Sequence, residues 1–155
     1  AEKITEGLKN FRNISGRQEM IKTDKYTIIR DCYNAGPESM AASLAVLGRK
    51  TGRRIAVLGD MLELGSAASA EHFKIGRIAA EKAELVFAYG PNASRIINGT
   101  ATGGMPETMG RAFDDREEMA KALKRAVKPG DVLLFKASRG MHLELVLEAF
   151  LKEEK

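Results

Sequence analysis

Three short, nearly continuous apolar runs constrain the fold of this chain most: RIAVL at 54–58, LVFAY at 85–89 and VLLF at 132–135. Runs of this length, rich in apolar and β-branched residues, are typical of strands that are buried on both faces of a parallel sheet. Segments with helical spacing lie between them, at 69–82 and 114–128. Because buried strands that alternate with helices form βαβ units, we expect a Rossmann-like α/β fold with a mainly parallel sheet and helices on both faces.

The first part of the chain has a different pattern. Short apolar-rich runs at 18–22 and 26–30 are separated by Thr-Asp-Lys, which predicts two strands joined by a tight turn and therefore one antiparallel strand near the N-terminus. Residues 37–50 predict a helix that begins with proline, a residue favoured in the first turn. The predicted buried face of this helix carries Met40, Leu44 and Leu47.

Weaker signals mark the rest of the chain. Asp114 followed by Glu117 matches a capping box, so Asp114 is the expected N-cap of the helix at 114–128. The glycine-rich stretch NGTATGGMP at 98–106 predicts a surface loop. The remaining expected elements are a short helix at 92–97, a weak strand at 107–113 and a final helix at 143–152.

Composition limits the class of protein. With 155 residues, 44% hydrophobic and 30% charged, the sequence fits one ordinary globular domain. One cysteine excludes an internal disulfide and favours a reducing compartment. The sequence contains no apolar run of about 18 residues and no apolar segment of the kind found in secretion signals. We therefore expect a cytoplasmic protein with no membrane partner.

The charge pattern argues against nucleic acid as a partner. The net charge is +4, but the basic residues are interleaved with acidic ones, tryptophan is absent and aromatic residues make up 6% of the chain. A basic stripe or a stacking platform for bases is therefore not evident. A mildly basic domain is compatible with anionic small molecules.

Several common site motifs are missing. GRKT at 48–51 resembles the end of a phosphate-binding loop, but it ends a predicted helix and lacks the GxxxxGK[ST] pattern. The sequence has no GxGxxG motif, and His72, His142 and Cys32 are too far apart to give zinc-ligand spacing. We therefore predict no metal site, and we interpret Cys32 as a small buried residue rather than a nucleophile.

Three polar, glycine-containing loops follow predicted strands: DCYNAGP at 31–37, GDMLELG at 59–65 and KASRGM at 136–141. Since the carboxyl ends of parallel strands share one edge, these loops predict a ligand site there. A carboxylate directly after a strand, as at Asp31, accepts bonds from ribose hydroxyls or caps a turn. Ser138 and Arg139 precede a predicted helix, which favours either a carboxylate or phosphate site or a plain N-cap beside an exposed arginine.

The apolar side chains of the loop at 59–65 are unusual for a connection that faces only solvent. They predict that this loop packs against a partner surface, such as another domain.

In this order the loops resemble the C-terminal domain of the Mur ligase family, and in particular its D-alanyl-D-alanine-adding members. The segments that carry the resemblance are GR at 16–17, DCYNAGPESM at 31–40, RRIAVLGDMLELG at 53–65, EHFKIG at 71–76 and GDVLLFKASRGM at 130–141. The sequence departs from the family pattern at Arg30, Cys32, Gly36 and Ala137, where the family usually has an acid, Ser, Asn and Gly, respectively.

The resemblance implies an ATP-dependent ligase that joins D-alanyl-D-alanine to UDP-N-acetylmuramoyl-tripeptide through an acyl phosphate in peptidoglycan precursor synthesis. It implies that ATP and magnesium are used by the full-length enzyme. In that interpretation residues 1–16 are the end of an inter-domain connection and residues 17–155 are the C-terminal domain. The central ATP-binding and N-terminal UDP-binding domains are then absent from this chain, so we expect it to be inactive alone and to hold no cofactor tightly.

The resemblance also implies site residues. Arg17, Asp31 and Asn34 match nucleotide-binding positions, with Arg17 near the phosphates and Asp31 at the ribose. Ser138 and Arg139 match the segment expected to hold the carboxylate of the incoming dipeptide. The resemblance assigns no catalytic residue in this chain, and it gives no chemical step to Asp60 or His72, although both lie in matching motifs.

Two alternatives remain open from the sequence. A sister Mur ligase or a folylpolyglutamate-type ligase domain would share the fold and the chemistry but use another amine substrate. A non-catalytic α/β binding module would share the fold pattern alone.

Overall fold

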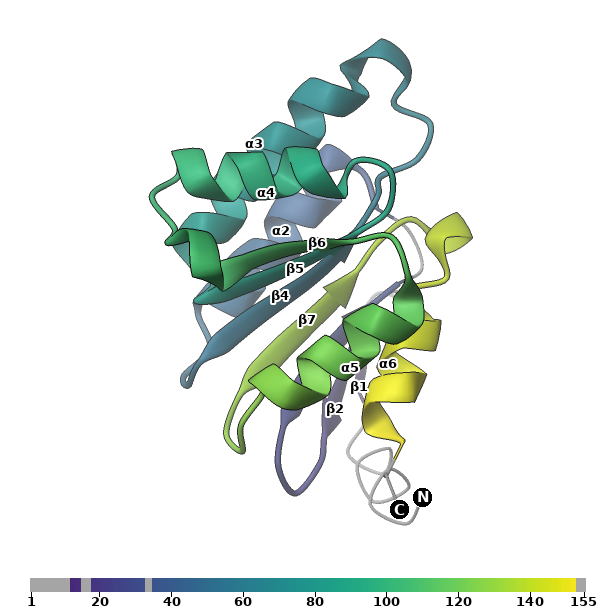
Figure 1. The fold of residues 1–155 in the computed structure, drawn as a ribbon. Helices are drawn as coiled ribbons and strands as arrows, with labels where there is room; N and C mark the ends of the chain where they lie inside the picture. Colours follow the sequence, from purple (N-terminus) through teal and green to yellow (C-terminus); the bar gives the residue numbers. More distant parts are fainter. Residues whose placement is uncertain (1–11, 15–17, 33–34, 153–155) are drawn as a thin grey trace.

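The computed structural model describes residues 12–14, 18–32 and 35–152, which form a seven-stranded sheet flanked by helices (Figure 1). The strands are β1 (Arg12–Ile14), β2 (Gln18–Lys22), β3 (Thr27–Asp31), β4 (Arg54–Gly59), β5 (Leu85–Tyr89), β6 (Gly110–Phe113) and β7 (Val132–Lys136). The α-helices are α2 (Pro37–Gly48), α3 (Ala68–Lys82), α4 (Ala93–Thr102), α5 (Arg116–Ala126) and α6 (Glu144–Leu151). Three 3-10 helices complete the list: η1 (Gly65–Ala67), η2 (Glu107–Met109) and η3 (Arg139–Met141).

The order of strands across the sheet is β1-β2-β3-β7-β4-β5-β6. Strands β3, β7, β4, β5 and β6 are parallel, and β2 runs antiparallel to both of its neighbours. The predicted fold class, with one antiparallel strand near the N-terminus, is therefore confirmed. Strand β1 was not predicted: residues 12–14, which the resemblance implies to be part of an inter-domain connection, pair with β2 at the edge of the sheet.

Strand β7 is the last strand in the chain but lies between β3 and β4 at the centre of the sheet. The chain leaves β3 and β4 toward α2 and α3, which pack on one face together with α4. It leaves β7 toward α6, which packs with α5 on the other face (Figure 1). Connections that depart to opposite faces open a crevice at the carboxyl ends of the strands, so the fold itself predicts a ligand site at the end of β7.

Side chains that alternate along the strands build two cores, one on each face. Leu133 and Phe135 of β7 pack against α5 and α6, while Val132 and Leu134 pack against the opposite layer. The predicted buried face of α2 is confirmed, because Met40, Leu44 and Leu47 are fully buried. Apolar burial on both faces explains why β4, β5 and β7 read as nearly continuous apolar runs.

Helix α4 extends through residues that the sequence analysis assigned to a surface loop. The segment 98–102 is helical, and Gly99 within it is buried against α3. The two helices approach so closely that an ideal Cβ on Gly99 would lie 2.1 Å from the carbonyl oxygen of Phe73. Glycine is therefore required here for helix contact. The loop prediction was wrong over 98–102, because local propensity counts glycine against a helix, and it is confirmed over 103–106.

The N-cap prediction for α5 was wrong by one residue. Asp115, and not Asp114, caps the helix: its carboxylate accepts from the backbone N–H of Glu117 at 2.8 Å and of Glu118 at 3.4 Å. Both aspartates suit a helix start, and local sequence alone does not distinguish two adjacent caps.

Candidate functional site

The three polar loops meet at the carboxyl edge of the central strands, as the sequence predicts, and Ser138 joins them. Its hydroxyl donates to the carbonyl of Ala35 at 3.2 Å and accepts from the backbone N–H of Leu62 at 2.8 Å. Its own N–H donates to the carbonyl of Asp60 at 3.0 Å. The buried residue Ser138 therefore links the loop after β7 to the loops after β3 and β4 by hydrogen bonds.

Asp31 lies at the end of β3, beside Lys136 at the end of β7, and the two are register partners across the parallel pair. Lys136 Nζ is 2.8 Å from Asp31 Oδ2, and the hydroxyl of Ser43 donates to the same oxygen at 2.7 Å. Both members of the ion pair are buried, Asp31 being 5% exposed and Lys136 2%. Asp31 Oδ1 is also buried but receives no hydrogen bond in the structure as described.

Sequence reasoning missed Lys136. The signal available was a lysine that ends the apolar run VLLFK directly before a polar loop. A lysine is almost never fully buried unless it is paired with an acid, so its burial predicts a nearby carboxylate. Asp31, at the end of the neighbouring strand β3, supplies it.

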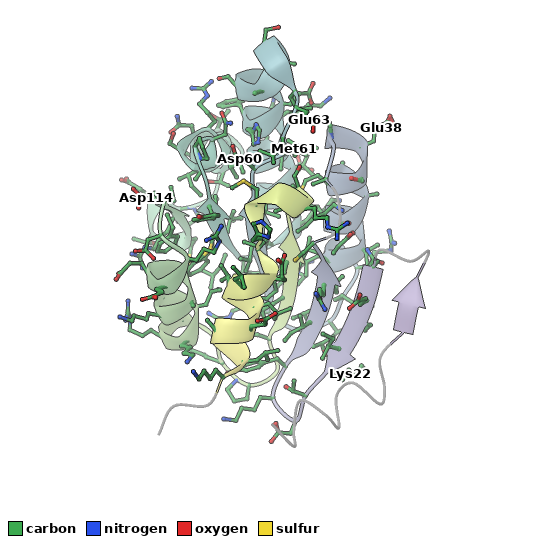
Figure 2. All side chains as sticks on the ribbon, turned by 90° about the vertical axis from the view of Figure 1, so that its right-hand side faces the viewer. Lys22, Glu38, Asp60, Met61, Glu63 and Asp114 are labelled. Atoms are coloured by element: carbon green, nitrogen blue, oxygen red, sulfur yellow. The ribbon has the colours of Figure 1, made fainter. Side chains whose placement is uncertain are left out.

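The loop after β4 is held from within the domain. The Asp60 carboxylate accepts from Asn92 through the backbone N–H at 3.0 Å and the side-chain amide at 2.8 Å, which anchors the loop to the start of α4. Met61 is buried, and Glu63 has a left-handed φ of 64°. Figure 2 shows Asp60, Met61 and Glu63 gathered at this end of the sheet. The expectation of a partner surface at this loop rests on Leu62, which is 41% exposed.

His72 is a structural residue of the same loop region. The buried ring accepts from the backbone N–H of Met61 through Nε2 at 2.9 Å, and Nδ1 lies 2.6 Å from the carbonyl oxygen of Ala68. These contacts require the tautomer with the proton on Nδ1, and they use both nitrogens. His72 therefore connects α3 to the loop after β4 and has no free nitrogen for a reaction.

The loop after β7 presents Arg139 to solvent. Arg139 is exposed and begins the 3-10 helix η3. Arg116 steadies this turn: its Nε and Nη2 donate to the carbonyl of Met141 at 3.3 and 3.2 Å, and its guanidinium lies 5.3 Å from the ring centroid of Tyr89. The two remaining predicted site residues, Arg17 and Asn34, lie outside the described residues.

Cys32 lies directly after Asp31 but is chemically shielded. It is 7% exposed, and its Sγ donates to the carbonyl of Phe135 at 3.6 Å. Burial raises the pKa of the Cys32 thiol to about 12. The thiolate is the reactive form, so the interpretation of Cys32 as a small buried residue is confirmed.

We expect Cys32 in the folded chain to resist iodoacetamide at pH 7.5. With a pKa of about 12, fewer than about one thiol in 10,000 is ionised at that pH. Mass spectrometry measures the labelled fraction, and the signal is unambiguous because the chain has one cysteine. The chain unfolded in urea should be labelled fully. In the folded chain, the rate of labelling of Cys32 should rise as the pH increases. Labelling at equal rates in both states would contradict the burial.

Within the described ranges, no group of three His, Cys, Asp or Glu side chains could hold a metal ion. The described helices also include none that is long and apolar enough to cross a membrane.

Two grooves lie at the opposite edge of the sheet. The larger, of about 470 Å³, is lined by side chains from the end of α3 and from the connection between α4 and β6, among them Met105 and Met109. The smaller, of about 240 Å³, shares Leu85 and Met109 with it. None of the three site loops lines either groove, so they are separate from the carboxyl edge.

Comparison with known proteins identifies the family. Residues 16–139 match the family model described as "Mur ligase, glutamate ligase domain". The UDP-N-acetylmuramoyl-tripeptide--D-alanyl-D-alanine ligase of Bacillus subtilis is 35% identical over 151 residues, which is 95% of this chain and 33% of that protein. The ligase of the same name from Escherichia coli is 33% identical over 150 residues, 94% of this chain and 32% of that protein. This chain therefore spans about a third of the length of these relatives.

Solved structures agree with the sequence matches. MurF from Acinetobacter baumannii superposes with a TM-score of 0.82 at 30% identity, covering 92% of this chain and 32% of that one. MurF from Thermotoga maritima in complex with ADP superposes with a TM-score of 0.76 at 34% identity, covering 90% of this chain and 31% of that one. The chain belongs to the Mur ligase family and is the C-terminal domain of such a ligase.

Proposed function

We propose that this domain serves an ATP-dependent ligase that joins D-alanyl-D-alanine to UDP-N-acetylmuramoyl-tripeptide. The observation that carries the proposal is the match of nearly the whole chain to relatives of that name, at 35% identity for the one from Bacillus subtilis. The complex of Thermotoga maritima MurF with ADP supports nucleotide use. The hydrogen bonds of Ser138 are consistent with a site here, because they bring the loops after β3, β4 and β7 together at one edge of the sheet.

In the proposed reaction, ATP transfers its γ-phosphoryl group to the terminal carboxylate of the tripeptide, which gives an acyl phosphate and ADP. The amine of D-alanyl-D-alanine then attacks the acyl carbon, and phosphate leaves as the amide bond forms. Both steps require anionic groups to be held close together while charge develops on the transferring oxygens. The contribution of this domain is therefore binding and orientation.

Asp31 is the proposed ligand of the nucleotide ribose. Its Oδ1 receives no hydrogen bond from the described residues, and a ribose hydroxyl is a donor that matches this acceptor. Arg17 and Asn34 belong to the same proposed nucleotide site. A cleft that closes over ATP needs such groups at the end of β3, which lies beside the crevice at the end of β7.

Arg139 is the proposed ligand of the dipeptide carboxylate, since a guanidinium fork matches the two oxygens of a carboxylate. Ser138 belongs to the same site but acts through its loop in the arrangement seen here. Its hydroxyl donates to the carbonyl of Ala35 and its N–H donates to the carbonyl of Asp60. Both donors are therefore engaged within the domain, and Ser138 fixes the start of η3.

Magnesium would accompany the phosphates of ATP in the full-length enzyme, and no described residue is proposed as its ligand. The proposed location of the enzyme is the cytoplasm, where ATP is available, and no nucleic acid partner is proposed. The central domain of the full-length ligase is the proposed partner of the exposed Leu62 and of the nucleotide-facing loops.

A screen of amine substrates tests the proposed function. The full-length protein should release phosphate from ATP when UDP-N-acetylmuramoyl-tripeptide and D-alanyl-D-alanine are both present, and at least about 100-fold more slowly with glutamate or single amino acids. Omission of the tripeptide substrate is the control. Preference for glutamate would favour the folylpolyglutamate-type alternative, and preference for another amino acid would favour a sister ligase. The chain of 155 residues alone should release no phosphate.

A further inference from the structure

We propose that Lys136 is a positioning residue of the nucleotide site: it holds Asp31 by one carboxylate oxygen and leaves the other oxygen for the nucleotide. This inference rests on the proposed role of Asp31, and it adds a residue that neither the sequence motifs nor the comparisons single out.

The geometry separates the two oxygens of the carboxylate. Lys136 Nζ and the hydroxyl of Ser43 both approach Oδ2, at 2.8 and 2.7 Å. Two donors on one oxygen, one from β7 and one from α2, fix the orientation of the carboxylate group. Within the part of the chain that the structure describes, Oδ1 is then left as a buried acceptor that receives no hydrogen bond. Such an atom is costly to keep, and a donor from a bound ligand would remove that cost.

The position of Lys136 explains why it acts through Asp31. It is 2% exposed, and the parallel register of β3 and β7 sets its main chain beside that of Asp31. Its ammonium group therefore interacts with the buried carboxylate of Asp31 and is not exposed to solvent. A buried carboxylate without a cation would be unstable, and it would also repel the phosphates of an approaching nucleotide. Paired with Lys136, Asp31 offers a hydrogen-bond acceptor with little net charge.

Four variants of the full-length protein test this inference: Lys136→Met, Asp31→Asn, the double variant and Ser43→Ala. The measurements are kcat, the KM values for ATP and for D-alanyl-D-alanine, and Tm. We expect Lys136→Met to raise the KM for ATP by roughly tenfold or more, with kcat and the dipeptide KM changed less than about threefold. Ser43→Ala removes one donor but keeps the charge, so its effect on the KM for ATP should be smaller.

The double variant distinguishes positioning from a merely structural role. It contains a neutral pair, so its Tm should recover relative to Lys136→Met. Its KM for ATP should equal that of Asp31→Asn alone, because Lys136 has nothing left to position. This comparison still holds if Lys136→Met alone does not fold.

Two results would overturn the inference, and they have different meanings. If the effects of the two substitutions on the KM for ATP add in the double variant, Lys136 does not act through Asp31. If Asp31→Asn leaves the KM for ATP unchanged, Asp31 is not a nucleotide ligand, and the proposed role of that residue fails as well. The amine screen decides the ligase function separately from both results.

Discussion

Replacement of Gly99 by alanine is expected to destabilise the folded chain by at least about 3 kcal/mol, at the upper end of what overpacking usually costs. An ideal Cβ on Gly99 would lie 2.1 Å from the carbonyl oxygen of Phe73. The facing position on α3 is equally tight, since a Cβ on Gly76 would lie 1.9 Å from the carbonyl oxygen of Ile96. These contacts are with backbone, which cannot rotate away as a side chain can, so α3 and α4 would have to separate.

Urea unfolding of the 155-residue chain, followed by circular dichroism, measures this effect. Gly36→Ser is the matched control, because Gly36 is the extended N-cap of α2 and a Cβ there has no atom within 4 Å. A serine N-cap should leave the free energy of unfolding unchanged or raise it by a few tenths of a kcal/mol. A change below about 1 kcal/mol for Gly99→Ala would show that the helices are not packed this closely.

Replacement of Arg139 by alanine in the full-length protein is expected to raise the KM for D-alanyl-D-alanine by roughly 10- to 100-fold, which is the usual loss for a hydrogen bond to a charged group. Arg139 is exposed on η3, and the proposed function gives its guanidinium the carboxylate of the dipeptide. The KM for ATP should change little, since Asp31, the proposed nucleotide ligand, lies at the start of a different loop. Steady-state kinetics with one substrate varied at a time measures both constants.

Two further variants sharpen this measurement. Arg139→Lys keeps the charge but loses the planar fork, so it should fall between the wild type and Arg139→Ala. Arg111→Ala removes the same charge from β6, where the guanidinium lies 4.8 Å from the ring centroid of Phe113 and away from the three loops. Its dipeptide KM should match the wild type. An unchanged dipeptide KM for Arg139→Ala would show that the dipeptide carboxylate binds elsewhere.

The central architecture could be predicted because it depends on patterns that survive in the sequence. The runs at 54–58, 85–89 and 132–135 are buried on both faces, and a strand in that position must be apolar almost throughout. The meeting of the three loops followed from the same pattern, since the loops come after parallel strands. Asp31 and Arg139 could be singled out as the polar groups of those loops.

What the sequence could not predict depends on contacts between distant segments. From the sequence alone Gly99 favours a loop. The requirement that this position have no side chain arises from the contact between α3 and α4, which local sequence does not show. The pairing of Lys136 with Asp31 requires that β7 and β3 be neighbours, which their positions in the chain do not suggest. In the local sequence Ser138 is typical of an N-cap. Its hydrogen bonds to Ala35 and Leu62, which link three loops, depend on the tertiary fold.

The place of β7 also governs how the domain can be assembled during synthesis. A nascent chain that has emerged only as far as α5 contains β3 and β4 but not the strand that lies between them. Both strands then keep an unpaired, apolar edge, which is the kind of surface that favours mispairing and chaperone binding. The ribosome must therefore deliver almost the whole domain before its sheet can close. Insertions and reporter fusions are safer beyond α6 than within the segment from β6 to β7.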